Sequence, residues 1–426
     1  NIVDALGIQK IYTYNEEGKL LTAGIGENRL LENTYDKSGY LVETTDALGR
    51  SIKRTYDENG YPNRIIQPDG SSIKLTCDER GNITSITDSY DKTIYYGYDE
   101  LNRVIQITDN VGNVTTYQYD ERDHLLVLTN PEGAVRRYTY NVSGKPVKIM
   151  DFDGSVVLID YNEMGMPSKI IDKEGHETRL RYDMAGNLSE EIYPTGSVSV
   201  YQYDRNDRLI HVKLLASQQD EKASRVVEYI YDPVGNLLEA RAGDGQEIMS
   251  VTKYEYDVLN RVSVIIDPAG GRTTYTYDKI CGKVNSITDA AGNQCTFHYN
   301  KMGELIEKKD IRGNITRYEY NALGKLTAIT DAASRTTRHY YLLGGRLEKT
   351  VYPDNRYMEY EYDNLGRLKK KTDQNGYSMI YNYDCMGRVI SVKSSTGQEK
   401  IYVYDFMGNI VSVTDANGNE TKYSYT

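Results

Sequence analysis

Apolar and polar residues alternate in short blocks that recur every 21 residues along the chain. A typical block, Arg317–Tyr320, places two tyrosines two residues apart, so that both side chains point to one face of a predicted strand. A second apolar block follows, as in Leu326–Thr330, and predicts a second strand. Each unit is therefore predicted to consist of a strand, a turn, a second strand and a second turn.

The second tyrosine of each pair, here called the register tyrosine, marks the period. The marks are Tyr14, Tyr35, Tyr56, Cys77, Tyr98, Tyr119, Tyr140, Tyr161, Tyr182, Tyr203, Tyr231, Tyr256, Tyr277, Tyr299, Tyr320, Tyr341, Tyr362, Tyr383, Tyr404 and Tyr425. The step is 21 residues, except for steps of 28, 25 and 22 before Tyr231, Tyr256 and Tyr299. A fixed period predicts a repeat architecture, so residues 1–426 are predicted to form a single continuous array of about 20 units.

The first turn has a clear chemical signature, with positions counted from the register tyrosine. Position plus one is Asp or Asn in eighteen of twenty units, and position plus four is Gly in fourteen of nineteen. Four of the five exceptions at plus four are Asn or Asp, as in Asn102 and Asp207, which are the residues that best tolerate positive φ after glycine. The fifth exception is Cys281, where the glycine is shifted to Gly282. We expect a left-handed backbone at plus four and a side-chain brace from plus one. Replacing Asn102 by glycine is then expected to be neutral or stabilising.

The second strand and the second turn are less regular. Apolar residues favour positions plus six and plus nine, which is not strict alternation, so a bulge near the first turn is predicted. The second turn usually follows a Thr-Asp-x-x-Gly pattern, as in Thr108–Gly112. Its glycine position is predicted to accept Asn28, Asp91 and Asn355 as well.

Short turns make consecutive strands antiparallel neighbours, so the fold class is all-β, a long antiparallel meander ribbon of about forty strands of roughly six residues each. Such a ribbon twists and must cover its tyrosine face. It could coil into a spiral whose inner face lines a hollow shell, or fold on itself as a filled sandwich. Tyrosine favours the hollow alternative, because its hydroxyl can meet solvent while its ring packs.

Two places break the period. Seven extra residues enter within 211–228, near Ala216–Lys222, and four enter within 238–253, near Gly243–Gly245. Both are predicted to extend the second turn at one edge of the ribbon. Insertions at loop tips are usually silent, although a binding role is an alternative.

Composition narrows the function further. Of 41 tyrosines, 32 stand at the register position or two residues before it, so the excess is architectural. The net charge of −11 excludes free nucleic acid as an expected partner, and no apolar run is long enough for a membrane span. The four cysteines, Cys77, Cys281, Cys295 and Cys385, form no CxxC pair and are expected to be isolated thiols. Because the sequence begins and ends within units, we expect a segment of a longer polypeptide.

The residues expected to carry chemistry are missing from the sequence pattern. The five histidines, His124, His176, His211, His298 and His339, stand in different units without metal-ligand spacing. No phosphate loop, zinc-binding helix or nucleophile elbow occurs. Asp151–Gly154 is only superficially like a calcium loop and is interpreted as another repeat turn. No catalytic residue, cofactor or metal is predicted.

The pattern Tyr-x-Tyr-Asp-x-x-Gly-Arg-Leu, as in Tyr360–Leu368, Tyr381–Val389 and Tyr402–Ile410, resembles the RHS or YD repeat over the whole chain. This family includes bacterial RHS polymorphic toxins, wall-associated proteins, the B and C components of toxin complexes, and teneurins. The resemblance implies a β-ribbon spiralled into a hollow shell, which encloses a C-terminal toxic domain in the toxins and serves adhesion in teneurins. It also implies a secreted or cell-surface protein.

Some toxin shells carry an Asp-Pro-x-Gly signature that cleaves its own chain. Asp232–Gly235 and Asp267–Gly270 match these letters, but both fall on repeat turns, where proline is common. They are interpreted as turn residues, and the chain is predicted not to be an enzyme.

Two classes of function remain open. The first is a structural scaffold, part of a shell around a cargo or toxin domain of the same polypeptide. The alternative is a module that binds carbohydrate or cell-surface glycans in adhesion. Unpaired strands at the ends also predict end-to-end self-association. The residues predicted to carry the repeat structure are Tyr119, Tyr140, Tyr320, Tyr362, Asp363, Gly366, Tyr383, Asp384, Gly387, Tyr404, Asp405 and Gly408.

Overall fold

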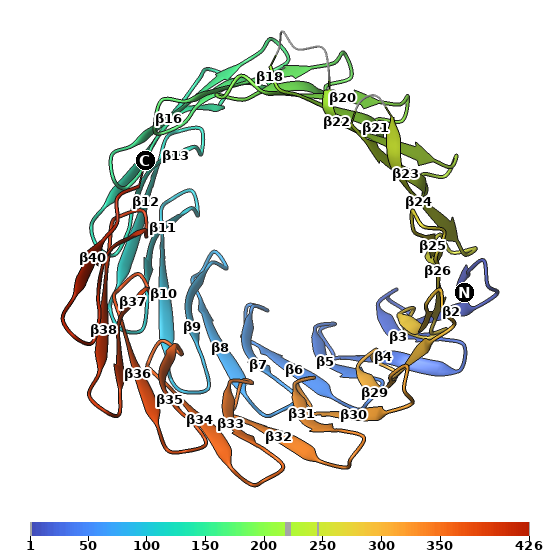
Figure 1. Cartoon of the computed structure of the whole chain (residues 1–426). Helices are drawn as coiled ribbons and strands as arrows, with labels where there is room; N and C mark the ends of the chain where they lie inside the picture. Colours follow the sequence, from blue (N-terminus) through green and yellow to red (C-terminus); the bar gives the residue numbers. More distant parts are fainter. Residues whose placement is uncertain (1, 218–222, 245–246, 426) are drawn as a thin grey trace. The chain divides into compact units, whose positions relative to one another are not determined.

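The computed structural model describes residues 2–217, 223–244 and 247–425. This part of the chain contains forty strands and no helix, so the predicted all-β class is confirmed. Within each of two compact parts, strands that follow one another in sequence pair antiparallel, as β34, β35 and β36 do (Figure 1). Accordingly, the described residues contain no helix that could span a membrane.

The strands follow one another along the chain. The first thirteen are β1 (Ile2–Val3), β2 (Gln9–Tyr14), β3 (Leu20–Ile25), β4 (Asn28–Tyr35), β5 (Leu41–Asp46), β6 (Ser51–Tyr56), β7 (Pro62–Ile66), β8 (Ser72–Cys77), β9 (Ile83–Thr87), β10 (Thr93–Tyr98), β11 (Val104–Thr108), β12 (Val114–Tyr119) and β13 (Leu125–Thr129). The next fourteen are β14 (Val135–Tyr140), β15 (Pro146–Met150), β16 (Val156–Tyr161), β17 (Pro167–Ile171), β18 (Glu177–Tyr182), β19 (Leu188–Ile192), β20 (Val198–Tyr203), β21 (Leu209–Leu215), β22 (Ala223–Tyr231), β23 (Leu237–Gly243), β24 (Ile248–Tyr256), β25 (Val262–Ile266), β26 (Arg272–Tyr277) and β27 (Val284–Thr288). The last thirteen are β28 (Gln294–Tyr299), β29 (Leu305–Lys309), β30 (Ile315–Tyr320), β31 (Leu326–Thr330), β32 (Thr336–Tyr341), β33 (Leu347–Val351), β34 (Tyr357–Tyr362), β35 (Leu368–Thr372), β36 (Ser378–Tyr383), β37 (Val389–Ser394), β38 (Glu399–Tyr404), β39 (Ile410–Thr414) and β40 (Glu420–Lys422).

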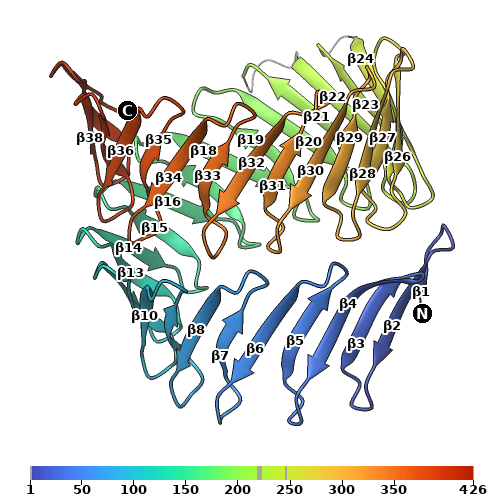
Figure 2. The same cartoon turned by 90° about the horizontal axis from the view of Figure 1, so that it is seen from below.

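The strands divide into two compact parts, here numbered unit 1 and unit 2, each of which contains many of the 21-residue repeat units. Unit 1 contains Asn1–Val135, Asp278–Lys283 and Thr296–Tyr425, and unit 2 contains Arg136–Tyr277 and Val284–Cys295. Unit 1 therefore combines two stretches of ribbon that are far apart in sequence, here called the first run (residues 2–135) and the second run (residues 296–425). Figure 2 shows strands of the second run, such as β31 and β32, next to the strands β5 to β8 of the first run.

The predicted bulge is present at the end of the first strand of the repeat. In the β34–β35 pair, Glu361 is opposite Lys370 whereas Tyr362 is opposite Leu368, so one residue of β35 is left over. Tyr360 is opposite Lys371 in the same pair. The extra residue brings positions plus six and plus nine onto the face that carries the two tyrosines, which explains the spacing of the apolar residues.

The backbone at plus four is left-handed, as predicted. The φ angles are +78° at Gly366 and +84° at Gly387, and they are +62° at Asn102 and +59° at Asp207. Gly282, with φ of +70°, takes this role beside Cys281. The turn chemistry read from the sequence is therefore confirmed at both the glycine and the Asx positions.

The second turn matches its prediction with two exceptions. Asp91 and Asn355 have φ of +57° and +65°, as expected. The assignment of Asn28 to this position was wrong: Asn28 begins β4 opposite Ile25, and Gly26, with φ of +54°, makes the turn. A two-residue hairpin replaces the usual longer turn here. Ser334, with φ of +60°, holds the position in another unit and was not predicted.

The ribbon is a single layer without a filled core. Among the described residues only four apolar side chains are buried: Val198, Val226, Val264 and Ala328. The accessible surface is 25646 Å² for 48.5 kDa, whereas a compact protein of that mass exposes roughly 17,000 Å². The filled-sandwich alternative is therefore excluded for this part of the chain.

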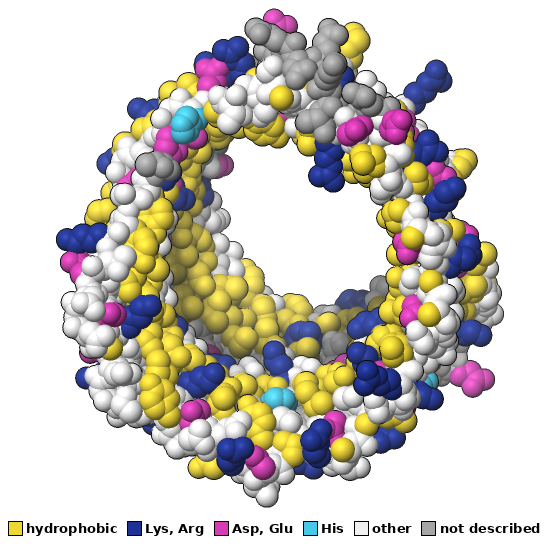
Figure 3. Space-filling model, viewed as in Figure 1, with side chains coloured by type: hydrophobic (Ala, Val, Ile, Leu, Met, Phe, Trp, Pro, Cys, Tyr) yellow, Lys and Arg dark blue, Asp and Glu magenta, His cyan; other side chains and the backbone are white. Residues whose placement is uncertain are grey.

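The two faces of the ribbon differ in chemistry. The tyrosine face of a unit carries half-buried side chains such as Tyr360, Tyr362 and Leu368. The opposite face carries charged pairs across neighbouring strands, for example Lys370 with Glu361 at 2.9 Å. Figure 3 shows hydrophobic side chains gathered along one face, with charged side chains along the edges and the other face.

The inserted residues lengthen the strands and not only the turn. β21 and β23 have seven residues and β22 and β24 have nine, against five and six in most units. The prediction that the insertions simply extend the second turn is thus corrected, because added residues join the antiparallel ladder, as in the pair Val198 and Leu215. Residues 218–222 and 245–246, on which part of this prediction falls, lie outside the described residues.

Candidate functional site

The aspartate at plus one closes the first turn with its own side chain. Oδ1 of Asp363 accepts hydrogen bonds from the backbone N–H groups of Leu365 and Arg367, both at 2.9 Å. The Nε of Arg367 donates to Oδ2 at 2.7 Å. The backbone N–H of Gly366 donates to the carbonyl of Asp363 at 3.0 Å. The predicted brace from plus one is therefore confirmed in this turn.

The arginine at plus five connects one unit to the next. Nη1 of Arg367 donates to the carbonyl oxygen of Asp384, the plus-one residue of the following unit, at 3.0 Å. Its guanidinium also lies over the ring of Tyr383, 4.5 Å from the centroid. Arg388 repeats both contacts with Asp405 at 2.9 Å and Tyr404 at 5.0 Å. In these two units the turn thus holds the next one through an arginine that contacts a carboxylate, a carbonyl and a ring.

The register tyrosine satisfies a carbonyl that the bulge leaves outside the strand ladder. Leu368 is opposite Tyr362, but the following β35–β36 ladder begins only at Lys370. The hydroxyl of Tyr383 in β36 donates to the Leu368 carbonyl at 2.7 Å. Fourteen register tyrosines make this bond to the preceding unit, at 2.5 to 3.0 Å: Tyr35, Tyr56, Tyr98, Tyr119, Tyr161, Tyr231, Tyr256, Tyr277, Tyr320, Tyr341, Tyr362, Tyr383, Tyr404 and Tyr425.

These contacts shift the titration of both residue types. Burial raises the pKa of Tyr362 and Tyr383 above the usual value. The hydrogen bond from Arg208 lowers the pKa of Asp204. At Asp363, burial is the largest effect and acts upward, but the hydrogen bonds from Arg367 outweigh it, so the pKa is lowered. The repeat therefore favours a neutral tyrosine beside an ionised aspartate.

Positions plus four and plus five of successive units are matched to each other. Wherever plus four is Asn or Asp instead of Gly, its Oδ1 accepts a hydrogen bond from the plus-five side chain of the preceding unit. That donor is asparagine in three cases and arginine in one. The four pairs are Asn82 with Asn102 (2.9 Å), Arg103 with Asp123 (2.8 Å), Asn187 with Asp207 (2.8 Å) and Asn236 with Asn260 (3.0 Å).

Several of the glycines at plus four have a second reason besides their φ angle. At Gly60 and Gly81 a Cβ atom would overlap the ring of Tyr40 or Tyr61, the plus-five residue of the preceding unit. At Gly366 it would overlap Nη1 of Arg346. The glycine thus makes room for a side chain that crosses from the neighbouring unit.

Within unit 1 the two runs contact each other through their turns. Arg50 pairs with Glu304 at 2.7 Å, and Arg388 pairs with Glu132 at 2.6 Å. These four side chains are 15% to 22% exposed, so the pairs are shielded from solvent more than ordinary surface ion pairs. No local sequence pattern indicates them, because the partners are about 255 residues apart.

Three further bonds join the runs with main-chain groups. Lys92 Nζ donates to the Asp363 carbonyl at 2.9 Å, and Asn110 Nδ2 donates to the Asn364 carbonyl at 2.9 Å. The backbone N–H of Gly344 donates to Oδ2 of Asp69 at 2.9 Å. Second turns of the first run therefore meet first turns of the second run.

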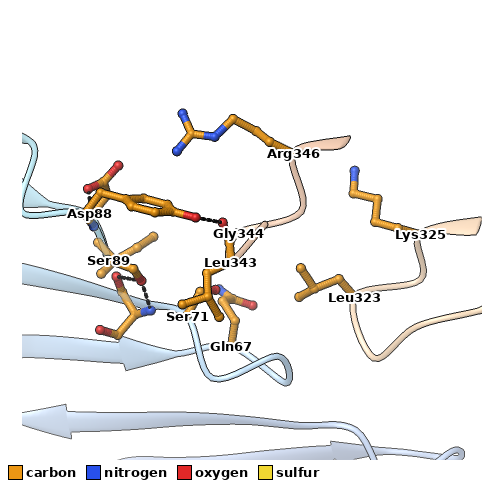
Figure 4. Close-up of a pocket in the computed structure, with 12 residues that line it drawn as sticks. Gln67, Ser71, Asp88, Ser89, Leu323, Lys325, Leu343, Gly344 and Arg346 are labelled. Carbon is orange, nitrogen blue, oxygen red and sulfur yellow. Dashed lines mark hydrogen bonds between the residues drawn. The ribbon is translucent and has the colours of Figure 1, made fainter. Parts of the chain in front are cut away.

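A cleft of about 540 Å³ lies between these turns (Figure 4). The Tyr90 hydroxyl donates to the Leu343 carbonyl at 3.2 Å beside it. The first run contributes Gln67, Ser71, Ser72, Ile73, Asp88, Ser89 and Tyr90 to the lining, and the second run contributes Leu323, Lys325, Leu343, Gly344 and Arg346. None of these lining residues was singled out from the sequence.

The Asp-Pro stretches form ordinary turns. Oδ1 of Asp232 accepts N–H bonds from Val234, Gly235 and Asn236 at 2.8 to 3.0 Å. Oδ1 of Asp267 accepts N–H bonds at 2.8 and 2.9 Å from the residues two and four positions later. Both carboxylates are therefore used as in other units.

One group has the composition of a metal site. Potential ligand atoms of Asp172, Glu174 and His176 lie within 4.8 Å of one another. Asp172 accepts the N–H groups of Glu174 and His176 and contacts Nδ1 of His176 at 3.2 Å, so the turn itself explains their proximity. This group was not predicted from the sequence, because its three residues belong to one repeat turn.

The remaining predicted residues are distributed along the ribbon. Tyr140 stacks on Tyr138 with ring centroids 6.5 Å apart, and Gly408 has φ of +88°. The four cysteines are free thiols. Burial raises the pKa of Cys281 and Cys385, which opposes thiolate formation. The structural repeat residues are brought together only as successive neighbours, not at one centre.

The meander, the register tyrosines and the Asx turns define an all-β repeat protein built from tyrosine–aspartate units. The Teneurin YD-shell family model matches residues 5–89, 129–291 and 265–380, which is more than half of the chain. The chain therefore belongs to the Teneurin YD-shell family. The RHS Repeat model also matches, at residues 98–135, so the resemblance drawn from the sequence is confirmed.

Solved structures share the fold. The crystal structure of TcdB2-TccC3 matches with a TM-score of 0.74 and 14% identity over 94% of this chain and 26% of that chain. TcdB2-TccC3-TEV gives 0.74 and 14% over 96% and 26%. The Tc holotoxin pore of Photorhabdus luminescens gives 0.53 and 16% over 96% and 23%. The chain thus spans about a quarter of the length of these chains, and the likeness concerns the fold. No curated protein matched.

Proposed function

We propose that the chain is a non-enzymatic scaffold, a continuous array of about 20 units that forms part of the shell wall of a larger exported or cell-surface protein. Its partner would be a cargo or toxin domain of the same polypeptide, enclosed by the wall. The observation that carries this proposal is the single-layer ribbon, in which only four apolar side chains are buried among the residues that the structure describes. A wall of this kind keeps an apolar face available to an enclosed chain.

Other observations support the scaffold over an enzyme. Plus-one carboxylates such as that of Asp363 are used in turns, and register tyrosines such as Tyr383 bond to carbonyl groups. The residues that define the repeat, among them Tyr362, Asp363 and Gly366, therefore stabilise neighbouring units. Membership in the YD-shell family and the fold shared with a toxin-complex chain fit this role.

The test uses the complete gene product. A protease-recognition sequence is placed directly after residue 426, and a matched one replaces the turn at Met184, whose side chain is fully exposed. We expect the second site to be cut rapidly and the first to resist until the protein is unfolded. Equal cutting of both sites in the folded protein would contradict enclosure.

Glycan binding is the second candidate, and one cleft favours it. Tyr340 and Tyr360 line an open cleft of about 500 Å³ together with Glu348, Glu359 and Glu361. Aromatic rings beside carboxylates can stack on a sugar and accept its hydroxyl groups. A glycan array with wild-type protein and Tyr340→Ala tests this. Binding that the substitution abolishes would support adhesion, whereas an array without any signal would remove it.

A further inference from the structure

Two positions around the cleft of Figure 4 depart from the usual repeat residues, and a third carries the uncharged alternative of the pattern. Leu342 stands at plus one where nearly every other unit has Asp or Asn. Asn321 stands at plus one of the preceding unit and carries no charge. Gln67 begins a second turn where aspartate is usual, as in Asp88 and Asp109. Leu342 and Asn321 therefore supply no plus-one carboxylate from the second run, whereas Asp69 and Asp88 contribute carboxylates from the first run.

The first consequence is an arginine without its usual carboxylate. Arg367 and Arg388 at plus five bond to Asp363 and Asp384 of their own turns at 2.7 and 2.6 Å. Leu342 cannot supply such a bond to Arg346, and no described residue forms a hydrogen bond or ion pair with the Arg346 guanidinium. Its donors are therefore available at the cleft.

The rings around Arg346 leave those donors free. The guanidinium lies 5.1 Å from the ring centroid of Tyr90 and 5.7 Å from that of Tyr362. Rings contact the flat faces of a guanidinium, whereas all five N–H donors point outward in its plane. The two rings therefore position the guanidinium, and its N–H groups, which have no described hydrogen-bond partner, can donate to a carboxylate.

A second cation and a carboxamide complete the polar lining. Lys325, at plus five after Asn321, also has no side-chain partner among the described residues, and its side chain passes close to Gly345. The Gln67 carboxamide is likewise without a described partner. Figure 4 shows Arg346 reaching over the ring on the Asp88–Ser89 side of the cleft, and Lys325 rising from the neighbouring turn of the second run.

The cations and the carboxylates at the cleft differ in whether they have hydrogen-bond partners. Lys325 and Arg346 have none among the described side chains, whereas Asp69, beside the lining residue Gly344, accepts bonds from Gly344 and Ser71. Oδ1 of Asp88 accepts the backbone N–H groups of Tyr90 and Lys92 at 2.8 and 3.1 Å, which ties this carboxylate to its own turn. Leu323 and Leu343 add an apolar wall beside the cations.

We propose that this cleft binds a small organic carboxylate. Its carboxylate group is held by Arg346 and Lys325, and its apolar body packs against Leu323 and Leu343. The ligand replaces the carboxylate that Leu342 and Asn321 fail to provide. This binding activity is separate from the scaffold role, because the cleft lies at the turns and not on the tyrosine face.

Titration calorimetry with three probes tests the chemistry of the ligand. Phenylacetate carries a carboxylate on an apolar ring, phenylacetamide is its uncharged counterpart, and inorganic phosphate is a compact anion. We expect saturable one-to-one binding of phenylacetate, and affinity for the other two weaker by about tenfold or more. Equal affinity for the amide, tighter binding of phosphate, or no saturation by phenylacetate at millimolar concentration would overturn the proposal.

Three variants test the location. Arg346→Gln should weaken phenylacetate binding about tenfold. Leu342→Asp should also weaken binding about tenfold, because the new carboxylate would bond to Arg346 as Asp363 bonds to Arg367. The protein should remain as stable as wild type or become more stable. Arg367→Gln is the matched control at the same repeat position and should bind like wild type. Retained affinity in Leu342→Asp, with thermal unfolding unchanged, would refute the site.

Discussion

Replacing Gly366 by alanine separates the two reasons for glycine at plus four. Gly366 and Gly387 occupy the same position in two adjacent repeats and have similar φ angles of +78° and +84°. They differ in their surroundings. A Cβ at Gly366 would overlap Arg346, whereas nothing lies within 4 Å of a Cβ at Gly387. The pair of substitutions therefore compares backbone strain with and without a crossing side chain.

The expected magnitudes follow from these contacts. Alanine in the left-handed conformation costs about 1 kcal/mol at either position. At Gly366 the flexible arginine must also move away, which weakens its contacts with the rings of Tyr90 and Tyr362. A cation–π contact at a partly exposed site contributes about 0.5–1 kcal/mol. Gly366→Ala should therefore destabilise by about 2 kcal/mol and Gly387→Ala by about 1 kcal/mol.

Equilibrium unfolding in urea measures both losses as shifts of the midpoint. The control compares the double variant Gly366→Ala/Arg346→Ala with Arg346→Ala alone. The loss of stability that Gly366→Ala adds in this background should equal the loss caused by Gly387→Ala in the wild type. Equal losses for the two single variants would show that Arg346 does not cross Gly366 in solution. Stability unchanged in both would refute the left-handed turn itself.

Four further predictions follow from the same geometry. Tyr383→Phe should cost about 1 kcal/mol in urea unfolding, because a carbonyl of the preceding unit loses its donor, whereas Tyr14→Phe, at an exposed site, should be neutral; equal effects would contradict the assigned bond. Turn carboxylates such as Asp204 have a lowered folded pKa, so their contribution to stability is present above about pH 4 and disappears as the pH falls through the folded value; a thermal midpoint that stays flat on acidification would argue against it. Mass spectrometry of protein stored for days should show one intact species, and a cut beside Asp232 or Asp267 that an Asp→Asn change abolishes would establish a self-cleaving shell. Among the described residues, the end strands β1 and β40 each pair with one strand, β2 or β39, so sedimentation should show association that rises with concentration; a strict monomer would remove this prediction.

The local fold could be predicted because its causes are local. Nine residues are enough to predict each first turn, as in Tyr360–Leu368. The two tyrosines predict the strand, Asp at plus one predicts the side-chain brace, and Gly at plus four predicts the left-handed backbone. Asn102 marks the limit of this reasoning. From its φ angle alone glycine is expected to be harmless there, but the side chain accepts a bond from Asn82. Asn102→Gly is now expected to be slightly destabilising.

Contacts between the runs could not be predicted in the same way. The ion pair of Arg50 with Glu304 depends on how far the ribbon bends per unit, and small differences in strand twist accumulate over many strands. The cleft near Arg346 depends on the same alignment. One signal was available in the sequence: Leu342 breaks the rule at plus one, and an arginine four residues later therefore lacks its usual partner.

The matching of plus four with plus five restricts how such an array can be recombined. A unit with tyrosine at plus five, such as Tyr40, requires a glycine in the next unit, because the tyrosine ring fills the space of a Cβ at Gly60. A unit with asparagine at plus five, such as Asn187, forms this bond only if the next unit offers an acceptor such as Asp207. Duplication, deletion or shuffling of whole units therefore succeeds only at junctions whose two edges agree, and a designed array would have to exchange units in compatible pairs.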